Sequence, residues 1–304
     1  MPSWNELLSQ LDNVQQDWWN NKLNQSLSAV GKLRGNRNVL FYASGFLQKP
    51  TAHPQLLQIT HEDINGFMSV MYGMDWSHGL TLLLHTPGGI GNAVETIVDY
   101  LWQKFPDFEV IVPVFAMSAG TMMSLASTKI IMGRQSQLGP IDPQLPIGGR
   151  FVSAQSVVDQ FTRARREILR NSAMATVWFP ILQSIGSAGL QEARNAIAYA
   201  KKMVAQWLQA HMFADHEDPE GSAERTVKFF SDVSRHRSHG RRINRAEARE
   251  QNVVIYDLED DQTLQDEVLT AYHLITLVFE KTPAAKVIVS HEGRRWIKNT
   301  QISP

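Results

Sequence analysis

Apolar residues at helical spacing mark the beginning of the chain. Ser3 and Glu6 form a capping box. Apolar side chains then repeat at steps of three and four residues, namely Trp4, Leu7, Leu8, Leu11, Val14 and Trp18. This pattern predicts an amphipathic N-terminal helix. The helix either covers a sheet of this chain or docks on another subunit, because the adjacent Trp18 and Trp19 cannot both face one stripe.

Strand and helix patterns alternate along the first half of the chain. Residues 39–46, 80–85, 109–115 and 129–133 have the composition of strands, and residues 61–72, 92–104 and 121–127 have helical periodicity. The run 80–85 is apolar except for Thr81, which is typical of a strand covered on both faces. Strands that alternate with helices indicate a parallel sheet with right-handed crossovers.

The second half is mostly helical. Helices are predicted over residues 157–170, 190–211, 223–234, 245–251 and 264–280, and short strands over 253–256 and 287–290. No internal repeat and no linker divides the chain. We therefore expect an α/β protein with a parallel β-sheet flanked by helices. It would have an N-terminal helical extension (1–34), one main domain with a helical C-terminal half (35–280) and a C-terminal tail (281–304).

Composition narrows the possible chemistry. The chain has 304 residues, of which 43% are hydrophobic and 19% charged, as in ordinary globular proteins. Its 29 Lys and Arg residues nearly balance 30 Asp and Glu residues, so nucleic-acid binding would need a local patch. The absence of cysteine excludes disulfides, cysteine–zinc sites, iron–sulfur clusters and a thiol nucleophile. We expect no cofactor. Without a signal-peptide pattern or a long apolar run, we expect a soluble cytoplasmic protein with no membrane partner.

Two glycine-containing turns follow neighbouring buried strands and carry the candidate chemistry. Because parallel strands end at the same edge of a sheet, both turns are expected at its carboxyl edge. Ser118 stands at the second turn, between small residues, where a hydroxyl can be presented as a nucleophile. The backbone N–H groups of Gly88, Gly89 and Ala119 could stabilise an oxyanion. The structural alternative is that Ser118 only caps its helix and that the two glycines only form a turn.

Three motifs in this order resemble the serine dehydrogenase proteinase (SDH) family. They are His85-Thr-Pro-Gly-Gly89, Ala116-Met-Ser-Ala-Gly-Thr121 and Leu138-Gly-Pro-Ile-Asp-Pro-Gln144, with fainter likeness at Ser238-His-Gly240, Ile243 and Glu247-Ala248. The family is a branch of the Clp-fold serine peptidases, related to signal peptide peptidase A and Clp protease. The resemblance implies a Clp/crotonase-type fold, cleavage of polypeptides, homo-oligomers, Ser118 as nucleophile, and an oxyanion hole at Gly89 and Ala119.

The general base is harder to assign. Lys129 lies eleven positions (129 minus 118) after Ser118, about 16 Å along a helix at ~1.5 Å per residue, which disfavours a Ser-Lys dyad. In Clp proteases a histidine follows the nucleophile's helix and strand, and an aspartate precedes a late helix. Here Asp142 and His239 occupy those two places in exchanged order. We therefore predict His239 as base, oriented by Asp142, with His85 in reserve. Alternatively, Asp142 caps a turn, His239 lies in a surface loop, and His85 is a buried histidine of the sheet edge.

Other readings compete with a peptidase. A crotonase-like enzyme acting on acyl-CoA would use the same paired N–H groups, and an inactive Clp-fold scaffold would use neither them nor the serine. The arginine-rich segment 235–249 could bind phosphates, or it could pair with the acidic segment 257–267. His211, Asp215, His216 and Asp218 lack metalloprotease spacing, so we predict no metal site there. No nucleotide-binding loop is present, so the predicted function is an ATP-independent serine peptidase.

Overall fold

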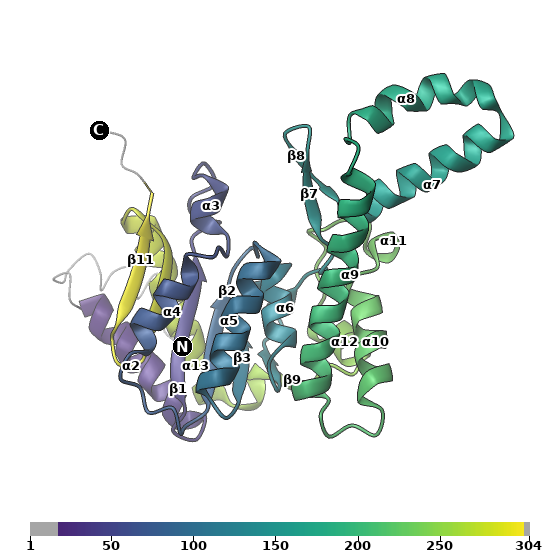
Figure 1. The fold of residues 1–304 in the computed structure, drawn as a ribbon. Coiled ribbons are helices and arrows are strands. Elements are labelled where there is room, and N and C mark those ends of the chain that lie inside the picture. The colour runs from purple at the N-terminus through teal and green to yellow at the C-terminus, as the bar shows by residue number, and fades with distance from the viewer. Residues whose placement is uncertain (1–17, 301–304) are drawn as a thin grey trace.

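A seven-stranded sheet forms the centre of the protein (Figure 1). A computed structural model describes residues 18–300, and the strand order in the sheet is β11-β10-β1-β2-β3-β5-β9. Its strands are β1 (Asn38–Ser44), β2 (Leu80–His85), β3 (Phe108–Val112), β5 (Ile130–Met132), β9 (Ile255–Asp257), β10 (Ala284–Ser290) and β11 (Arg295–Asn299). The first five run parallel, while β10 and β11 are antiparallel at one edge. The predicted α/β class with a parallel sheet is thus confirmed.

The helices cover both faces of this sheet. They are α2 (Trp18–Leu33), α3 (Pro54–Leu57), α4 (Asp63–Met71), α5 (Gly91–Lys104), α6 (Ala119–Leu125), α7 (Ala154–Arg170), α8 (Ala175–Gln183), α9 (Gly189–Trp207), α10 (Pro219–Phe230), α11 (Val233–His236), α12 (Arg245–Arg249) and α13 (Gln262–Lys281). α2 and α13 pack on one face, and α4, α5 and α6 on the other (Figure 1).

The alternation of side chains along the strands explains these two layers. In β2, Leu80, Leu82 and Leu84 join the core under α5, whereas Leu83 joins the core under α13. Each face of a strand receives every second residue, so a strand that is apolar throughout requires cover on both sides. The predicted N-terminal capping box lies in residues 1–17, outside the described residues.

Two parts of the chain differ from the sequence expectations. Residues 284–299, within the predicted tail, form β10 and β11, and all seven residues of β10 are buried. β10 pairs with β1, a partner so distant in sequence that no local pattern indicates it. In addition, β7 (Gln144–Ile147) and β8 (Arg150–Ser153) form a hairpin that local periodicity did not predict. A second short pair, β4 (Phe115–Ala116) and β6 (Gln137–Leu138), lies beside the nucleophile turn.

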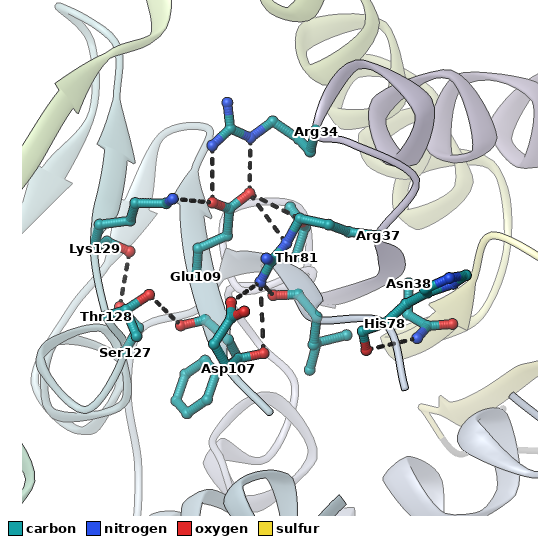
Figure 2. A network of polar contacts seen from close by, with 12 residues as sticks. Arg34, Arg37, Asn38, His78, Thr81, Asp107, Glu109, Ser127, Thr128 and Lys129 are labelled. Carbon is teal, nitrogen blue, oxygen red and sulfur yellow. Dashed lines mark hydrogen bonds and ion pairs between the residues drawn. The ribbon is translucent and has the colours of Figure 1, made fainter. Parts of the chain in front are cut away.

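The amino edge of the sheet is closed by a buried carboxylate, Glu109 (Figure 2). Its two oxygens accept hydrogen bonds of 2.8 Å from Arg34 Nε and Nη2, and Oε1 accepts a third, also 2.8 Å, from Thr81 Oγ1. Lys129 Nζ lies 3.3 Å from Oε2. Burial by itself raises the pKa of Glu109, but the hydrogen bond and charge of Arg34 outweigh it, and the pKa is lowered. The network ties α2 to three strands of the sheet.

Candidate active site

Ser118 stands at the bend between β4 and α6 in an unusual backbone conformation. Its φ of 52° and ψ of −115° lie where non-glycine residues are rare. Such strain is concentrated at functional turns, and a sharp strand-to-helix turn exposes a nucleophilic serine. Ser118 occupies the N-cap position of α6, yet its side chain makes no capping hydrogen bond. The alternative that the hydroxyl serves only as a helix cap therefore lacks its hydrogen bond.

The turn after β2 lies directly against this bend. A Cβ atom on Gly88 would stand 2.8 Å from Ser118 Cβ and 2.6 Å from the Met117 carbonyl oxygen, so a side chain has no room there. Gly88 also has a φ of 100°, which L-residues rarely adopt. The two turns predicted to meet at the carboxyl edge do meet, and only glycine permits the contact.

Two backbone amides in these turns are available to a ligand. Ala119 begins α6, so its N–H has no partner within the helix. In the described part of the chain, neither its amide nor that of Gly89 donates a hydrogen bond to the protein. Gly88 differs from the sequence expectation, because its amide donates to Thr86 Oγ1 at 3.1 Å. Gly88 therefore offers space, while Gly89 and Ala119 offer donors.

A buried ion pair holds the first turn in place, and the sequence analysis missed it. Ile59 N donates to the Gly88 carbonyl and Ile90 N donates to the Ile59 carbonyl, at 2.8 and 2.9 Å. Next to Ile59, the Gln58 carbonyl accepts 2.7 Å from Lys286 Nζ, which also donates to Asp63 Oδ1 at 2.6 Å. Lys286 arrives on β10, so only the nonlocal pairing of β10 with β1 could have indicated this arrangement.

Asp142 and His239 come together from distant loops, as their pairing in the sequence analysis anticipated. His239 Nδ1 lies 2.7 Å from Asp142 Oδ1. The carboxylate side chain is 6% exposed and the imidazole 32%. With Nδ1 donating its proton to the carboxylate, the tautomer leaves Nε2 as an acceptor. This is the arrangement by which an aspartate orients a general base.

Gln144 completes this polar group, although the sequence analysis assigned it no role. Its Nε2 donates to Asp142 Oδ2 at 2.6 Å and lies 3.3 Å from His239 Nδ1. The two carboxylate oxygens thus have separate partners, His239 and Gln144. The only signal in the sequence was the position of Gln144 in the motif that ends at this residue.

All these residues open onto one cavity of about 1110 Å³. Its wall includes Ser118, Ala119, Gly89, Asp142, Gln144 and His239. Helix α9 contributes apolar side chains to the opposite wall, and Phe151 of the β7–β8 hairpin overhangs it. A large concave site with few convergent polar groups is typical of substrate pockets. The nucleophile candidate, the two amides and the Asp142–His239 pair therefore share one space.

The reserve base His85 is elsewhere. It is buried among Phe46, Phe115 and Tyr272, with ring centroids 5.2, 5.8 and 5.0 Å away. Burial lowers the pKa of His85 to about 3, and Nδ1 has no hydrogen-bond partner. His85 does not line the cavity. It is a neutral core histidine, and Lys129 is likewise held by Glu109 at the opposite edge.

The other charged candidates are engaged by neighbours. Arg245 and Arg249 pair with Asp257, and Arg241 pairs with Glu247, so the basic segment meets the acidic one as the structural alternative anticipated. His211 stacks on Trp102 with ring centroids 3.4 Å apart. Within residues 18–300, no three His, Asp or Glu side chains gather in a way that could hold a metal ion.

Comparison with known proteins adds a family to this geometry. The model of the ClpP-like SDH-type serine proteinases matches residues 55–177, which include Gly89, Ser118 and Asp142. This segment of the chain belongs to the ClpP-like SDH-type serine proteinase family. The match confirms the resemblance carried by the three motifs, and the Clp-like α/β fold class with it. His239 lies outside the matched segment, so its pairing with Asp142 rests on the geometry.

Individual relatives match shorter segments or match weakly. Protein MJ0137 of Methanocaldococcus jannaschii is 40% identical over 87 residues, 29% of this chain and 30% of that protein. MJ1495 of the same organism is 35% identical over 89 residues, 29% of each chain. The aligned segments thus span less than a third of these relatives.

A solved structure of a mutant of the membrane-bound stomatin-specific protease 1510-N is 20% identical. It covers 70% of this chain and 79% of its own, with a TM-score of 0.37. Among the described residues, none of the helices combines the length and apolarity needed to cross a bilayer.

Proposed function

We propose that this protein is an ATP-independent serine peptidase that cleaves polypeptides through an acyl-enzyme at Ser118. One observation carries the proposal. The uncapped Ser118 hydroxyl, at a strained strand-to-helix bend, opens onto the same cavity as a hydrogen-bonded Asp142–His239 pair. The family of residues 55–177 supports a serine proteinase, and the site assignment is specific to this proposal.

The proposed reaction is acyl transfer in two stages. His239 Nε2 accepts the Ser118 proton while Oγ attacks the peptide carbonyl carbon, and the carbonyl oxygen becomes an oxyanion. The amides of Gly89 and Ala119 donate to that oxyanion. His239 then returns the proton to the leaving amine, and the C–N bond breaks. Water, deprotonated by His239, hydrolyses the ester and releases the second product.

Asp142 orients the imidazole and stabilises its charged form, and Gln144 holds the carboxylate. This division of roles follows from their contacts, because Asp142 touches His239 and Gln144 touches the second carboxylate oxygen. We include homo-oligomer formation in the proposal on the strength of the family resemblance.

Covalent labelling and proteolysis test the proposal together. Wild-type protein should react with a fluorophosphonate probe at Ser118, located by mass spectrometry, and should degrade unfolded casein. Ser118→Ala should lose labelling and at least ~10³-fold of the turnover, since the nucleophile is removed. Ser77→Ala, a change at an exposed serine, serves as the matched control and should leave both unchanged. Equal turnover by wild type and Ser118→Ala would overturn the proposal.

The same experiment separates the two competing functions. A crotonase-like enzyme would bind a CoA thioester and leave Ser118 unlabelled. An inactive scaffold would show neither labelling nor thioester binding.

A further inference from the structure

Helices α7 and α8 form an arm that projects from the body of the protein (Figure 1). The arm leaves the sheet after the β7–β8 hairpin and returns along α9. α7 packs its apolar face against α9 through Val157, Val158 and Phe161, whereas α8 lies at the outer end. The catalytic proposal assigns no role to this end, which we call the arm tip (residues 171–191).

The arm tip lacks charge and is apolar at its surface. No Asp, Glu, Lys or Arg occurs in residues 171–191. In α8, Val177, Phe179 and Ile181 are 52%, 67% and 41% exposed, and Leu169 at the end of α7 is 77% exposed. A helix that is apolar around most of its circumference is normally buried on most sides. Here the protein covers only one side, since Trp178 is the single buried residue of α8.

The tip is nevertheless firmly attached. Trp178 Nε1 donates to Glu167 Oε2 at 2.9 Å, and the Arg163 guanidinium lies over the Trp178 ring, 5.8 Å from its centroid. Arg163 Nε in turn donates to Glu167 Oε1 at 2.8 Å. The exposed apolar side chains are therefore presented from a fixed helix.

Positive charge borders the tip. Between residues 160 and 189 there are four arginines, Arg163, Arg165, Arg166 and Arg170, and one acid, Glu167. Glu167 is engaged by Arg163, and Arg165, Arg166 and Arg170 are exposed. This local excess contrasts with the whole chain, whose formal net charge is −1. The arm thus combines an uncharged apolar end with a cationic flank.

We propose that the arm tip docks on an anionic lipid surface, with α8 lying in the interface and the arginines contacting acidic headgroups. Arginine-flanked apolar helices of this kind lie in the plane of a bilayer interface. α8 has nine residues, so it is about 14 Å long at ~1.5 Å per residue, too short to span a bilayer and long enough to lie in it. The expectation of no membrane partner rested on the missing span, which this mode does not need.

Charge favours lipid over a second copy of the chain. A symmetric contact between two tips places the same patch of each copy together. The arginine-rich flanks of both copies would then face one another, and like charges oppose the contact. An acidic lipid surface instead neutralises them.

Vesicle flotation with the full-length protein tests the proposal. Wild type should float with phosphatidylcholine vesicles that contain 30% phosphatidylglycerol at 50 mM salt, and not with pure phosphatidylcholine. Binding should weaken at 500 mM salt, because charge screening acts on the arginines. Phe179→Ser/Ile181→Ser should reduce the apparent affinity at least ~10-fold, through loss of apolar insertion. Arg165→Gln/Arg166→Gln should reduce it roughly 20-fold.

Matched controls carry the same chemical change elsewhere. Met68→Ser/Tyr72→Ser removes two exposed apolar side chains from the α4 region, and Lys22→Gln/Lys32→Gln removes two positive charges from α2. Both controls should float like wild type, and all variants should keep the wild-type melting temperature. Because peptidase activity is not the readout, the test is independent of the catalytic proposal.

Two results would overturn the proposal. One is wild type that ignores acidic vesicles at low salt, or tip variants that bind them as well as wild type does. The other is a fall in sedimentation coefficient caused by the tip variants without any vesicle binding by wild type, which would identify the tip as a contact between copies.

Discussion

The two edges of the central sheet treat polar groups in opposite ways. At the amino edge, the Glu109 carboxylate has Arg34, Thr81 and Lys129 around it, and its charge is met within the protein (Figure 2). At the carboxyl edge, the Ser118 hydroxyl makes no cap and the amides of Gly89 and Ala119 have no partner in the described structure. His239 keeps one nitrogen free and half-faces the cavity.

The difference separates structural from functional polar groups within one sheet. Satisfied buried polar groups stabilise the fold, and their loss costs stability. Donors and acceptors left open around a cavity are unsatisfied until a ligand arrives, so their loss is expected in activity. Substitutions at the two edges should therefore have different measurable effects.

The largest effect is expected at the carboxyl edge. Asp142→Asn keeps the shape of the side chain but removes the charge that orients His239, and it favours the wrong imidazole tautomer. We expect kcat on a peptide substrate to fall about 10⁴-fold. The melting temperature should change little, because the residue's neighbours remain packed. A double variant with His239→Ala should be no slower than His239→Ala alone, since groups that act as a unit are not additive.

At the amino edge the expected loss is in stability. Glu109→Gln removes the buried negative charge and leaves the Arg34 and Lys129 charges without their partner. The free energy of unfolding should fall by about 3 kcal/mol, measured by urea denaturation. Turnover per folded molecule should stay near wild type. Asp107→Asn, at a half-exposed carboxylate paired with Arg37, should cost less than about 1 kcal/mol. A large loss of turnover in folded Glu109→Gln would erase the contrast between the edges.

His85 predicts a smaller, pH-dependent effect. Burial lowers its folded-state pKa to about 3, whereas an unfolded histidine titrates near 6.5. Protons therefore bind the unfolded state preferentially, and the stability contribution is full above pH ~6.5 and is lost as pH falls toward 3. Between pH 7 and 5 this loss is about 2 kcal/mol.

Denaturation at several pH values measures this term. His85→Leu should lose about 2 kcal/mol less than wild type on acidification from pH 7 to 5. His61→Leu, at an exposed histidine, should follow the wild-type profile. Parallel pH profiles for wild type and His85→Leu would show that His85 is accessible to protons in the folded protein.

The smallest effect concerns the support of the pair. Gln144→Ala removes one of the two partners of the Asp142 carboxylate. A hydrogen bond to a charged group contributes about 1.5 kcal/mol, so kcat should fall about tenfold while KM stays constant. Gln144→Asn, whose shorter amide keeps a donor near the carboxylate, should lose less. Equal kcat in wild type and Gln144→Ala would limit the site to Ser118, Asp142 and His239.

Much of the fold was predictable because its signals are local. The strand over residues 80–85 and the helices near 92–104 and 264–280 have buried or amphipathic patterns, and the structure has β2, α5 and α13 there. The tail was predicted less well, since β10 depends on a partner strand at the other end of the sequence. The β7–β8 hairpin also lacked a strong pattern, because its residues are mostly half-exposed.

The sequence by itself determined the nucleophile turn, since a serine among small residues after a buried strand, opposite a Gly-Gly turn, is a short-range chemical pattern. It also suggested Asp142 and His239 as a pair. Only the tertiary structure decided that His239 Nδ1 meets Asp142, that Gly88 gives space and no donor, and that Lys286 anchors the turn through Gln58. These contacts join segments far apart in the chain, and their distances follow from how sheet and helices pack, which local residue patterns do not encode.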